Sequence, residues 1–159
     1  RQGWQGVHSE NWLWNATFGA LLWDIIYDPA YGAFHHPLQL SPSDLYTVEF
    51  YVKRRDAIEE RLSAIHDFTA AALRIQQICA EKRGIHNPFV FWHEGLEALL
   101  LALLAHTPPA AMSAILRHLS QDIQRRRKGF PDLFLWKDGN YRFLEVKSPN
   151  DQLAPHQYQ

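Results

Sequence analysis

The sequence predicts an α/β domain that is predominantly helical and carries a β-hairpin near its C-terminal end. Apolar residues recur at helical spacing in successive segments between residues 9 and 122, and prolines and glycines separate these segments. Two apolar segments flank a turn at Asp138-Gly139, which is typical of an antiparallel hairpin. The length of 159 residues is that of one domain with a sizeable core.

The first expected helix runs from Ser9 to Tyr27. Its apolar stripe consists of Trp14, Phe18, Leu21, Leu22 and Ile25. Glu10 lies one turn before Trp14 on the same stripe, where a buried charge needs a partner. The alternative is that Glu10 occupies the first helical turn, where the helix dipole favours a negative charge, with Ser9 as the cap. Periodicity alone favours this alternative.

Four more helices are expected, after a loop that runs from Tyr31 to Pro42 and contains two prolines. The helices are expected over residues 48–67, 69–83, 94–106 and 109–122. On the first of these, Glu59 and Arg61 are expected to lie on a solvated face.

The hairpin is expected to pair Leu133–Trp136 with Tyr141–Lys147. Side chains alternate along a strand, so Glu145 and Lys147 share one face. A two-residue loop at Asp138-Gly139 places Asp132 opposite Glu145, whereas a three-residue loop shifts the pairing by one. The two-residue loop gathers two carboxylates and one ammonium at the end of a sheet.

Two carboxylates this close repel each other, and a divalent cation relieves the repulsion. Carboxylate oxygens suit magnesium or manganese, which also take waters and phosphate oxygens. The alternative is an exposed hairpin with a cross-strand salt bridge, which is the commoner meaning of an isolated Asp…Glu-x-Lys pattern. The apolar run Leu133–Trp136 predicts a strand buried on both faces. Charges at the end of such a core strand favour the metal site.

The same residues resemble a known signature. Pro131-Asp132 followed by Glu145-Val146-Lys147 resembles the signature of the PD-(D/E)xK nucleases. The wider text, Gly129-Phe130-Pro131-Asp132-Leu133 and residues 145–153, resembles the VRR-NUC branch, and most closely the nuclease domain of the Fanconi-associated nucleases.

Upstream, His8-Ser9-Glu10-Asn11 and the segment 18–26 match the part of these proteins that carries a catalytic glutamate. The resemblance implies a restriction-endonuclease-like core with a large helical insertion at about residues 43–122. It also implies that residues 1–159 are a single VRR-NUC domain from a longer protein, and that the C-terminal part of the core is missing from this chain.

The resemblance implies a complete catalytic set. The catalytic residues would be Glu10, Asp132, Glu145 and Lys147. One or two Mg²⁺ or Mn²⁺ ions would be held by Glu10, Asp132, Glu145 and the carbonyl of Val146. Lys147 would orient the attacking water or stabilise the transition state, and Gln157 would either support the site or be a surface residue.

The implied function is hydrolysis of DNA. Members with the long insertion resemble a monomeric, structure-selective nuclease that cuts 5′ flaps, with 5′-to-3′ exonuclease activity, on branched or flapped DNA during repair, including interstrand crosslink repair. Such a protein would work with its other domains in the nucleus of a eukaryote, or in the cytoplasm at the nucleoid of a bacterium. Two alternatives stay open: a Holliday-junction resolvase of the small VRR-NUC type, and an inactive scaffold that binds DNA or a protein. Cleavage of flap and four-way-junction substrates, with the mass in solution, separates the three.

Charge and composition restrict the classes of partner and of compartment that the sequence allows. The net charge of −1 is not that of a strongly basic nucleic-acid binder, but Arg125, Arg126, Arg127 and Lys128 form a basic run just before Gly129. This run is expected to contact phosphate, the alternative being a solvated helix end. Among the tryptophans, Trp4 and Trp12 are the ones expected near DNA. No apolar run reaches membrane-spanning length, and a single cysteine excludes an internal disulfide.

Overall fold

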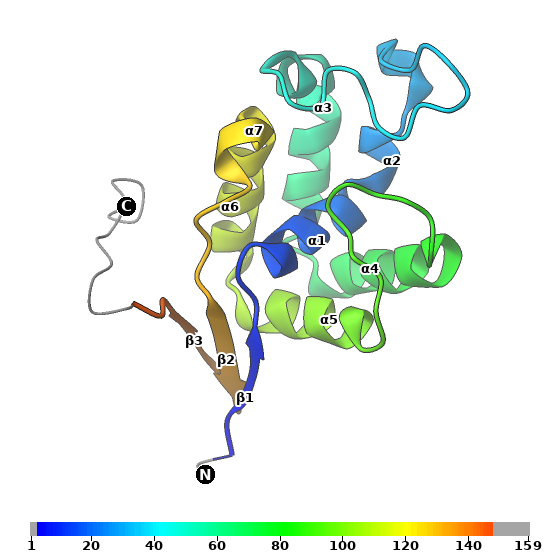
Figure 1. Cartoon of the computed structure of the whole chain (residues 1–159). Helices are drawn as coiled ribbons and strands as arrows, with labels where there is room; N and C mark the ends of the chain where they lie inside the picture. Colours follow the sequence, from blue (N-terminus) through cyan, green and yellow to red (C-terminus); the bar gives the residue numbers. More distant parts are fainter. Residues whose placement is uncertain (1–2, 148–159) are drawn as a thin grey trace.

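A computed structural model describes residues 3–147 as a group of helices beside a three-stranded antiparallel sheet (Figure 1). The sheet has the order β1-β2-β3, with β1 at Gln5–His8, β2 at Leu133–Lys137 and β3 at Asn140–Leu144. The helices are α1 (Trp12–Leu21), α2 (Trp23–Ile26), α3 (Glu49–Ala64), α4 (Phe68–Lys82), α5 (Leu96–His106), α6 (Pro109–Gln121) and α7 (Ile123–Arg126), with a 3₁₀ turn at Pro29–Tyr31.

The predominantly helical α/β class is confirmed. The four inner helices are confirmed as α3 to α6, with ends shifted by at most three residues. The first helix begins three residues later than expected, at Trp12, because residues 9–11 link β1 to α1. It is also interrupted at Leu22, whose backbone (φ −107°, ψ 15°) departs from helical geometry.

The hairpin has the predicted two-residue loop. The register pairs Leu133 with Leu144 and Lys137 with Asn140. Asp138 and Gly139 both have positive φ, 47° and 80°, as a tight type I′ hairpin turn requires. Continued by one position, this register sets Asp132 against Glu145.

Burial of β2 on both faces is wrong. Only Phe134 is buried in this strand, at 0% exposure, and the other four residues are half-buried. Phe134 stacks on Phe143 at 5.1 Å, and Trp14 of α1 packs on Phe143 at 5.6 Å. The helices thus cover the Phe134 face of the sheet, and Leu133 and Leu135 on the opposite face stay partly exposed.

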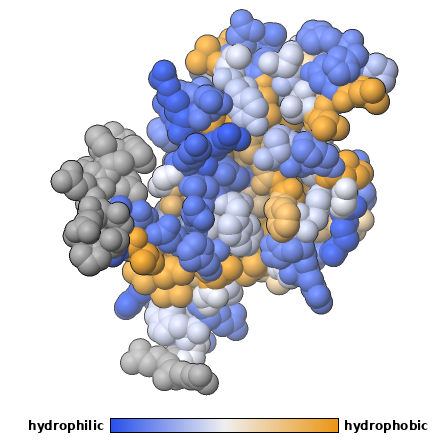
Figure 2. Space-filling view, in the orientation of Figure 1, coloured by the Kyte–Doolittle hydropathy of each residue, from blue (hydrophilic) through white to orange (hydrophobic). Residues whose placement is uncertain are grey.

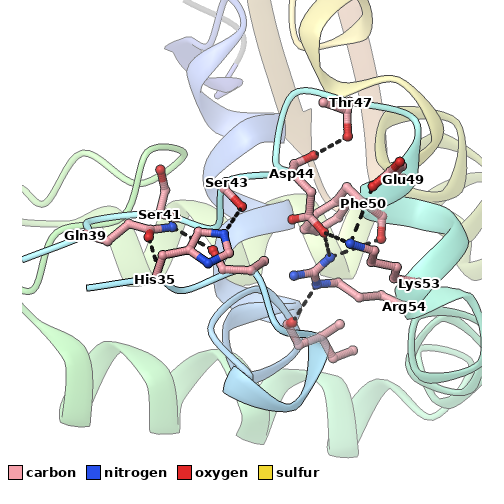
Figure 3. A network of polar contacts seen from close by, with 12 residues as sticks. His35, Gln39, Ser41, Ser43, Asp44, Thr47, Glu49, Phe50, Lys53 and Arg54 are labelled. Carbon is pink, nitrogen blue, oxygen red and sulfur yellow. Dashed lines mark hydrogen bonds and ion pairs between the residues drawn. The ribbon is translucent and has the colours of Figure 1, made fainter. Parts of the chain in front are cut away.

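A buried arginine ties the chain between α2 and α3 to both helices (Figure 3). The Arg54 side chain is 0% exposed and its Nη1 donates to Asp44 Oδ2 at 2.9 Å. Its Nε donates to the Ile25 carbonyl at 3.2 Å. The guanidinium lies over the rings of Tyr31 and Phe50, at 4.6 and 4.5 Å from their centroids. Planar cations favour such stacking on aromatic faces, so this cluster fixes the beginning of α3.

The solvated face expected for α3 is also wrong in part. Glu59 is only partly exposed and accepts three hydrogen bonds from Arg117 of α6: from Nε to Oε1 at 2.8 Å and to Oε2 at 3.1 Å, and from Nη2 to Oε2 at 2.8 Å. Arg61 pairs with Asp24 of α2 at 2.8 Å. These charges bind helices to one another and so belong to the packing of the domain.

Within residues 3–147, no single helix is long and apolar enough to cross a bilayer, and α5 and α6 reach the required length and composition only as a pair bent by 116°. The leucines of α5 are explained by packing, since Leu96, Leu100 and Leu103 are at most 2% exposed.

Candidate active site

Backbone hydrogen bonds bring Glu10 to Asp132. The chain leaves β1 at His8, and the amides of Ser9 and Glu10 both donate to the Asp132 carbonyl, at 2.7 and 3.0 Å. The buried Ser9 hydroxyl donates to the Pro131 carbonyl at 3.1 Å. Two segments far apart in the sequence are thus joined next to the proposed metal ligands.

Glu10 does not lie in a helix. It is exposed and has a positive φ of 35°, in a short link between β1 and α1. The alternative that placed it in the first helical turn with Ser9 as the cap is therefore wrong. A non-glycine residue in this backbone region is held there at a cost of about 1–3 kcal/mol, and such residues gather at functional sites. Asn11 supports the link, because its Oδ1 accepts a hydrogen bond from the Phe130 amide at 3.1 Å.

Asp132, Glu145 and Lys147 meet at one end of the hairpin. The Val146 amide donates to Asp132 Oδ2 at 2.8 Å, across the ends of the paired strands. Lys147 Nζ lies 3.2 Å from Glu145 Oε1. Both residues follow β3, which ends at Leu144, so the expected strand through Lys147 is wrong over its last three residues. Both of these side chains are about one-third exposed, at 32% and 31%. Their contact with solvent leaves room for a substrate phosphate.

The donor set suits a hard divalent cation. The oxygens here are the carboxylates of Asp132 and Glu145 and the carbonyl of Val146, and magnesium is commonly held by one or two carboxylates with waters and phosphate oxygens. Within residues 3–147, no three His, Cys, Asp or Glu side chains converge closely enough to hold a metal ion. The structure thus brings two of the predicted acids to one strand end and joins Glu10 to them through the backbone. Glu10 as a third ligand stays a prediction, and Gln157 lies outside the described residues.

The basic run lies between α6 and β2. Arg125 is exposed over 86% of its side chain, and the chain's cationic surface continues with Lys128. Arg126 Nη1 donates to the His118 carbonyl at 2.9 Å, and the guanidinium of Arg127 lies 5.1 Å from the ring centroid of Tyr46. Figure 2 shows a largely hydrophilic face over α6 and α7. This placement leaves Arg125 and Lys128 accessible to a phosphate backbone.

A pocket of about 380 Å³ lies beside this run, lined by Arg125, Arg126, Lys128, Phe130 and His118 among others. Burial lowers the pKa of His118, and the charge of Arg126 lowers it further. A neutral imidazole is therefore favoured near neutral pH, and the positive charge of the pocket comes from its arginines and lysine.

Sequence reasoning missed the strand that positions Glu10. β1 pairs with β2 from Gln5↔Trp136 to His8↔Leu133. The signal was Gly6, where a Cβ would lie 2.3 Å from Leu135 Cδ2, so the residue permits a close approach of two strands. Trp12, which is expected near DNA, donates from its indole Nε1 to the His8 carbonyl at 2.8 Å.

Comparison with known proteins gives one consistent result. The model of the VRR-NUC domain matches residues 69–159. The chain is 35% identical over 161 residues to a Fanconi-associated nuclease 1 homolog of Oryza sativa subsp. japonica, and 36% identical over 151 residues to one of Pseudomonas aeruginosa. It is 35% identical over 160 residues to Fanconi-associated nuclease 1 of Homo sapiens. These alignments cover 98%, 93% and 96% of this chain.

Solved structures agree. The chain superimposes on paFAN1 bound to gapped DNA with a two-nucleotide 5′ flap, with a TM-score of 0.87 and 33% sequence identity. On the paFAN1 complex with a one-nucleotide 5′ flap, the TM-score is 0.88 and the sequence identity is 34%. Both superpositions cover 99% of this chain and 29% of the other. The chain spans 17%, 27% and 16% of the rice, Pseudomonas and human relatives.

Proposed function

We propose, from the premise that this chain belongs to the VRR-NUC domain family, that it forms the catalytic centre of a metal-dependent, structure-selective DNA nuclease. Its fold is that of the VRR-NUC nucleases, which are of the PD-(D/E)xK type. The proposed substrate is DNA with a 5′ flap, and the similarity to chains bound to 5′-flap DNA supports this choice.

One observation carries the proposal. The predicted register places Asp132 against Glu145, and the Val146 amide holds the Asp132 carboxylate at 2.8 Å while Lys147 lies 3.2 Å from Glu145. An acid pair can hold a divalent cation, and a lysine beside it supplies a positive charge, which together support hydrolysis of a phosphodiester. The alternative, an exposed hairpin with a cross-strand salt bridge, differs from the contact found, because Glu145 and Lys147 lie on the same side of the hairpin turn.

Each residue then has a defined task. Asp132, Glu145 and the Val146 carbonyl would hold one or two Mg²⁺ or Mn²⁺ ions, with Glu10 as a further ligand. A bound metal ion supplies a water of lowered pKa and neutralises charge on the phosphoryl oxygens. Lys147 presents a compact positive charge to the water or to the charge that develops on the phosphate.

The basic run holds the substrate backbone. Arg125 and Lys128 are exposed and lie just before the strand that carries Asp132. Phosphate contacts of this kind position DNA without reading its sequence, which suits an enzyme that selects a branch structure. We further propose a monomeric protein with associated 5′-to-3′ exonuclease activity. It would act in DNA repair, including interstrand crosslinks, in a nucleus or at a nucleoid.

The test is cleavage of a labelled 5′-flap duplex by the intact protein, with Mg²⁺, with Mn²⁺ and with a chelator. Asp132→Asn and Lys147→Ala are each expected to lower the cleavage rate by roughly a thousandfold or more, equivalent to about 4 kcal/mol of transition-state stabilisation at ~1.4 kcal/mol per decade. Binding of the same DNA in a chelator is expected to change little.

Asp138→Asn is the matched control. It removes a carboxylate from the same hairpin, at the exposed turn, and asparagine tolerates the positive φ of that position. Its cleavage rate should equal that of the wild-type protein. Cleavage at the wild-type rate by Asp132→Asn, or cleavage that persists in the chelator, would refute the proposed function.

A further inference from the structure

A recess of about 560 Å³ lies against Glu10, outside the cluster formed by Asp132, Glu145 and Lys147. The link before α1 contributes Glu10 to its lining, and α1 contributes Trp12 and Asn15. The segment between α4 and α5, the green loop of Figure 1, contributes Asn87 and Phe91. A volume of this size is within the range of pockets that hold small organic groups.

The segment between α4 and α5 is firmly placed. Phe89 is 5% exposed and its ring meets Phe18 of α1 at 4.9 Å. Asn87 and Val90 form a β-bridge, with the Val90 amide donating to the Asn87 carbonyl at 3.1 Å. Gly19 of α1 leaves room for this segment, because a Cβ there would lie within 3 Å of three of its atoms. The recess therefore has a fixed wall.

On this fixed wall Phe91 is 77% exposed. Its ring lies 6.3 Å from that of His93, and His93 in turn meets Trp12 edge-on at 5.4 Å. The Trp12 ring is held by the hydrogen bond from its Nε1 to His8. Phe91 is thus an exposed aromatic ring at the edge of the recess, where it can stack on a ligand.

The lining favours a nucleobase over a phosphate. No lysine or arginine from the described part of the chain lines the recess, and Glu10 would repel an anion. Two residues of the lining, Asn15 and Asn87, each have a buried amide atom, Oδ1 and Nδ2 respectively, without a hydrogen-bond partner among the described residues. Every base has a face that stacks on an aromatic ring, and Phe91 supplies such a ring.

We propose that this recess binds an unpaired nucleobase of the substrate, stacked on Phe91, next to the bond that is cut. The inference deepens the proposed function and rests on it for the identity of the ligand as DNA. The Glu10 amide is bound to the Asp132 carbonyl at 3.0 Å, so a base seated against Glu10 lies beside the strand end that carries the acids. Phe91 is then a positioning residue, and Trp12 has a place in the same site.

The experiment uses the intact protein in a chelator, so that the DNA stays uncut. A 5′-flap substrate carries 2-aminopurine at one unpaired position at a time. One position is expected to show quenched fluorescence on binding, and Phe91→Ala is expected to abolish this quenching and raise the Kd about tenfold, equivalent to ~1.4 kcal/mol. An abasic nucleotide at that position should raise the wild-type Kd by the same factor, with no further loss in the variant.

Two variants separate stacking from general damage. Phe91→Trp should keep the quenching, because it retains an aromatic face. Phe68→Ala removes a phenylalanine of α4 that is 49% exposed, and should bind and quench like the wild-type protein. If Phe91→Ala and the wild-type protein show equal quenching and equal Kd, the proposal that a base stacks on Phe91 in this recess is refuted.

Adding Mg²⁺ to the same samples reports the proposed function separately. If the wild-type protein cleaves the flap but shows no position-specific quenching, base binding in the recess is refuted and the proposed nuclease function stands. If fluorescence is quenched at a single position but the flap is never cleaved, base binding in the recess stands and the proposed nuclease function is refuted.

Discussion

Replacing Arg54 with methionine should destabilise the domain without touching the site. Arg54 is 0% exposed and Asp44 is 6% exposed, with 2.9 Å between Nη1 and Oδ2. Removing the guanidinium leaves the Asp44 carboxylate buried, with Lys53 Nζ at 3.8 Å as its remaining cationic partner among the described residues. Loss of one partner of a buried ion pair costs about 3–5 kcal/mol. For a chain of this size, ~1 kcal/mol moves Tm by about 2–4 °C, so a fall of roughly 10 °C is expected.

The pair itself should be replaceable. Arg54 Nη2 and Asp44 Oδ1 have no hydrogen-bond partner among the described residues, so the pair does not recover all of its desolvation cost. The double variant Arg54→Met with Asp44→Asn should therefore recover much of the lost Tm. Thermal unfolding followed by circular dichroism measures both. A single variant within about 2 °C of the wild type, or a double variant no better than the single, would refute the reasoning.

Two further outcomes are expected from thermal unfolding. Gly19→Ala should lower Tm, because the added methyl group overpacks against residues 87–90 at a cost of about 1–3 kcal/mol. This cost exceeds the ~1 kcal/mol by which alanine is favoured over glycine in a helix. A raised Tm would contradict the close approach of residues 87–90 to Gly19. The hydrogen bond from Arg117 lowers the pKa of Glu59 below 4.5 despite partial burial, so its contribution to stability is present above that pH and lost as pH falls through the folded-state pKa. Glu59→Gln should thus have a lower Tm than the wild type near pH 7, and the difference should shrink below pH 4.5; a difference that is constant with pH would exclude this linkage.

The hairpin was predictable because its determinants are local. Asp138-Gly139 is a turn that needs two positive φ values, and it fixes the register of the strands on both sides. That register decides whether Asp132 faces Glu145. The local turn signal is therefore enough to predict that Asp132 and Glu145 lie at the same end of the hairpin. Burial of β2 was wrong because it depends on which faces the helices cover.

Glu10 was placed in the wrong element because its surroundings are not local. Residues 5–8 pair with a strand far along the chain, and four residues give too short a pattern to compete with the helical periodicity that follows. Arg61 and Glu59 were placed wrongly for a related reason. Charges at helical spacing resemble a solvated face, and only the packing of α3 against α2 and α6 shows their partners.

The long helical segment between Glu10 and Asp132 does not separate them, because side chains join the two ends directly. Ser9 Oγ donates to the Pro131 carbonyl at 3.1 Å, Asn11 Oδ1 accepts from the Phe130 amide at 3.1 Å, and Asn15 Nδ2 donates to the Arg127 carbonyl at 2.9 Å. These three links connect residues 9, 11 and 15 with residues 131, 130 and 127, so the two segments run antiparallel, and we call this set of links the zipper. The loop that they close adds little to the cost of bringing the ends together, since the entropy of closure grows only with the logarithm of loop length. The position of Glu10 relative to Asp132 is therefore set by this zipper and by β1, and the helices between them are free to shape the recess beside Glu10.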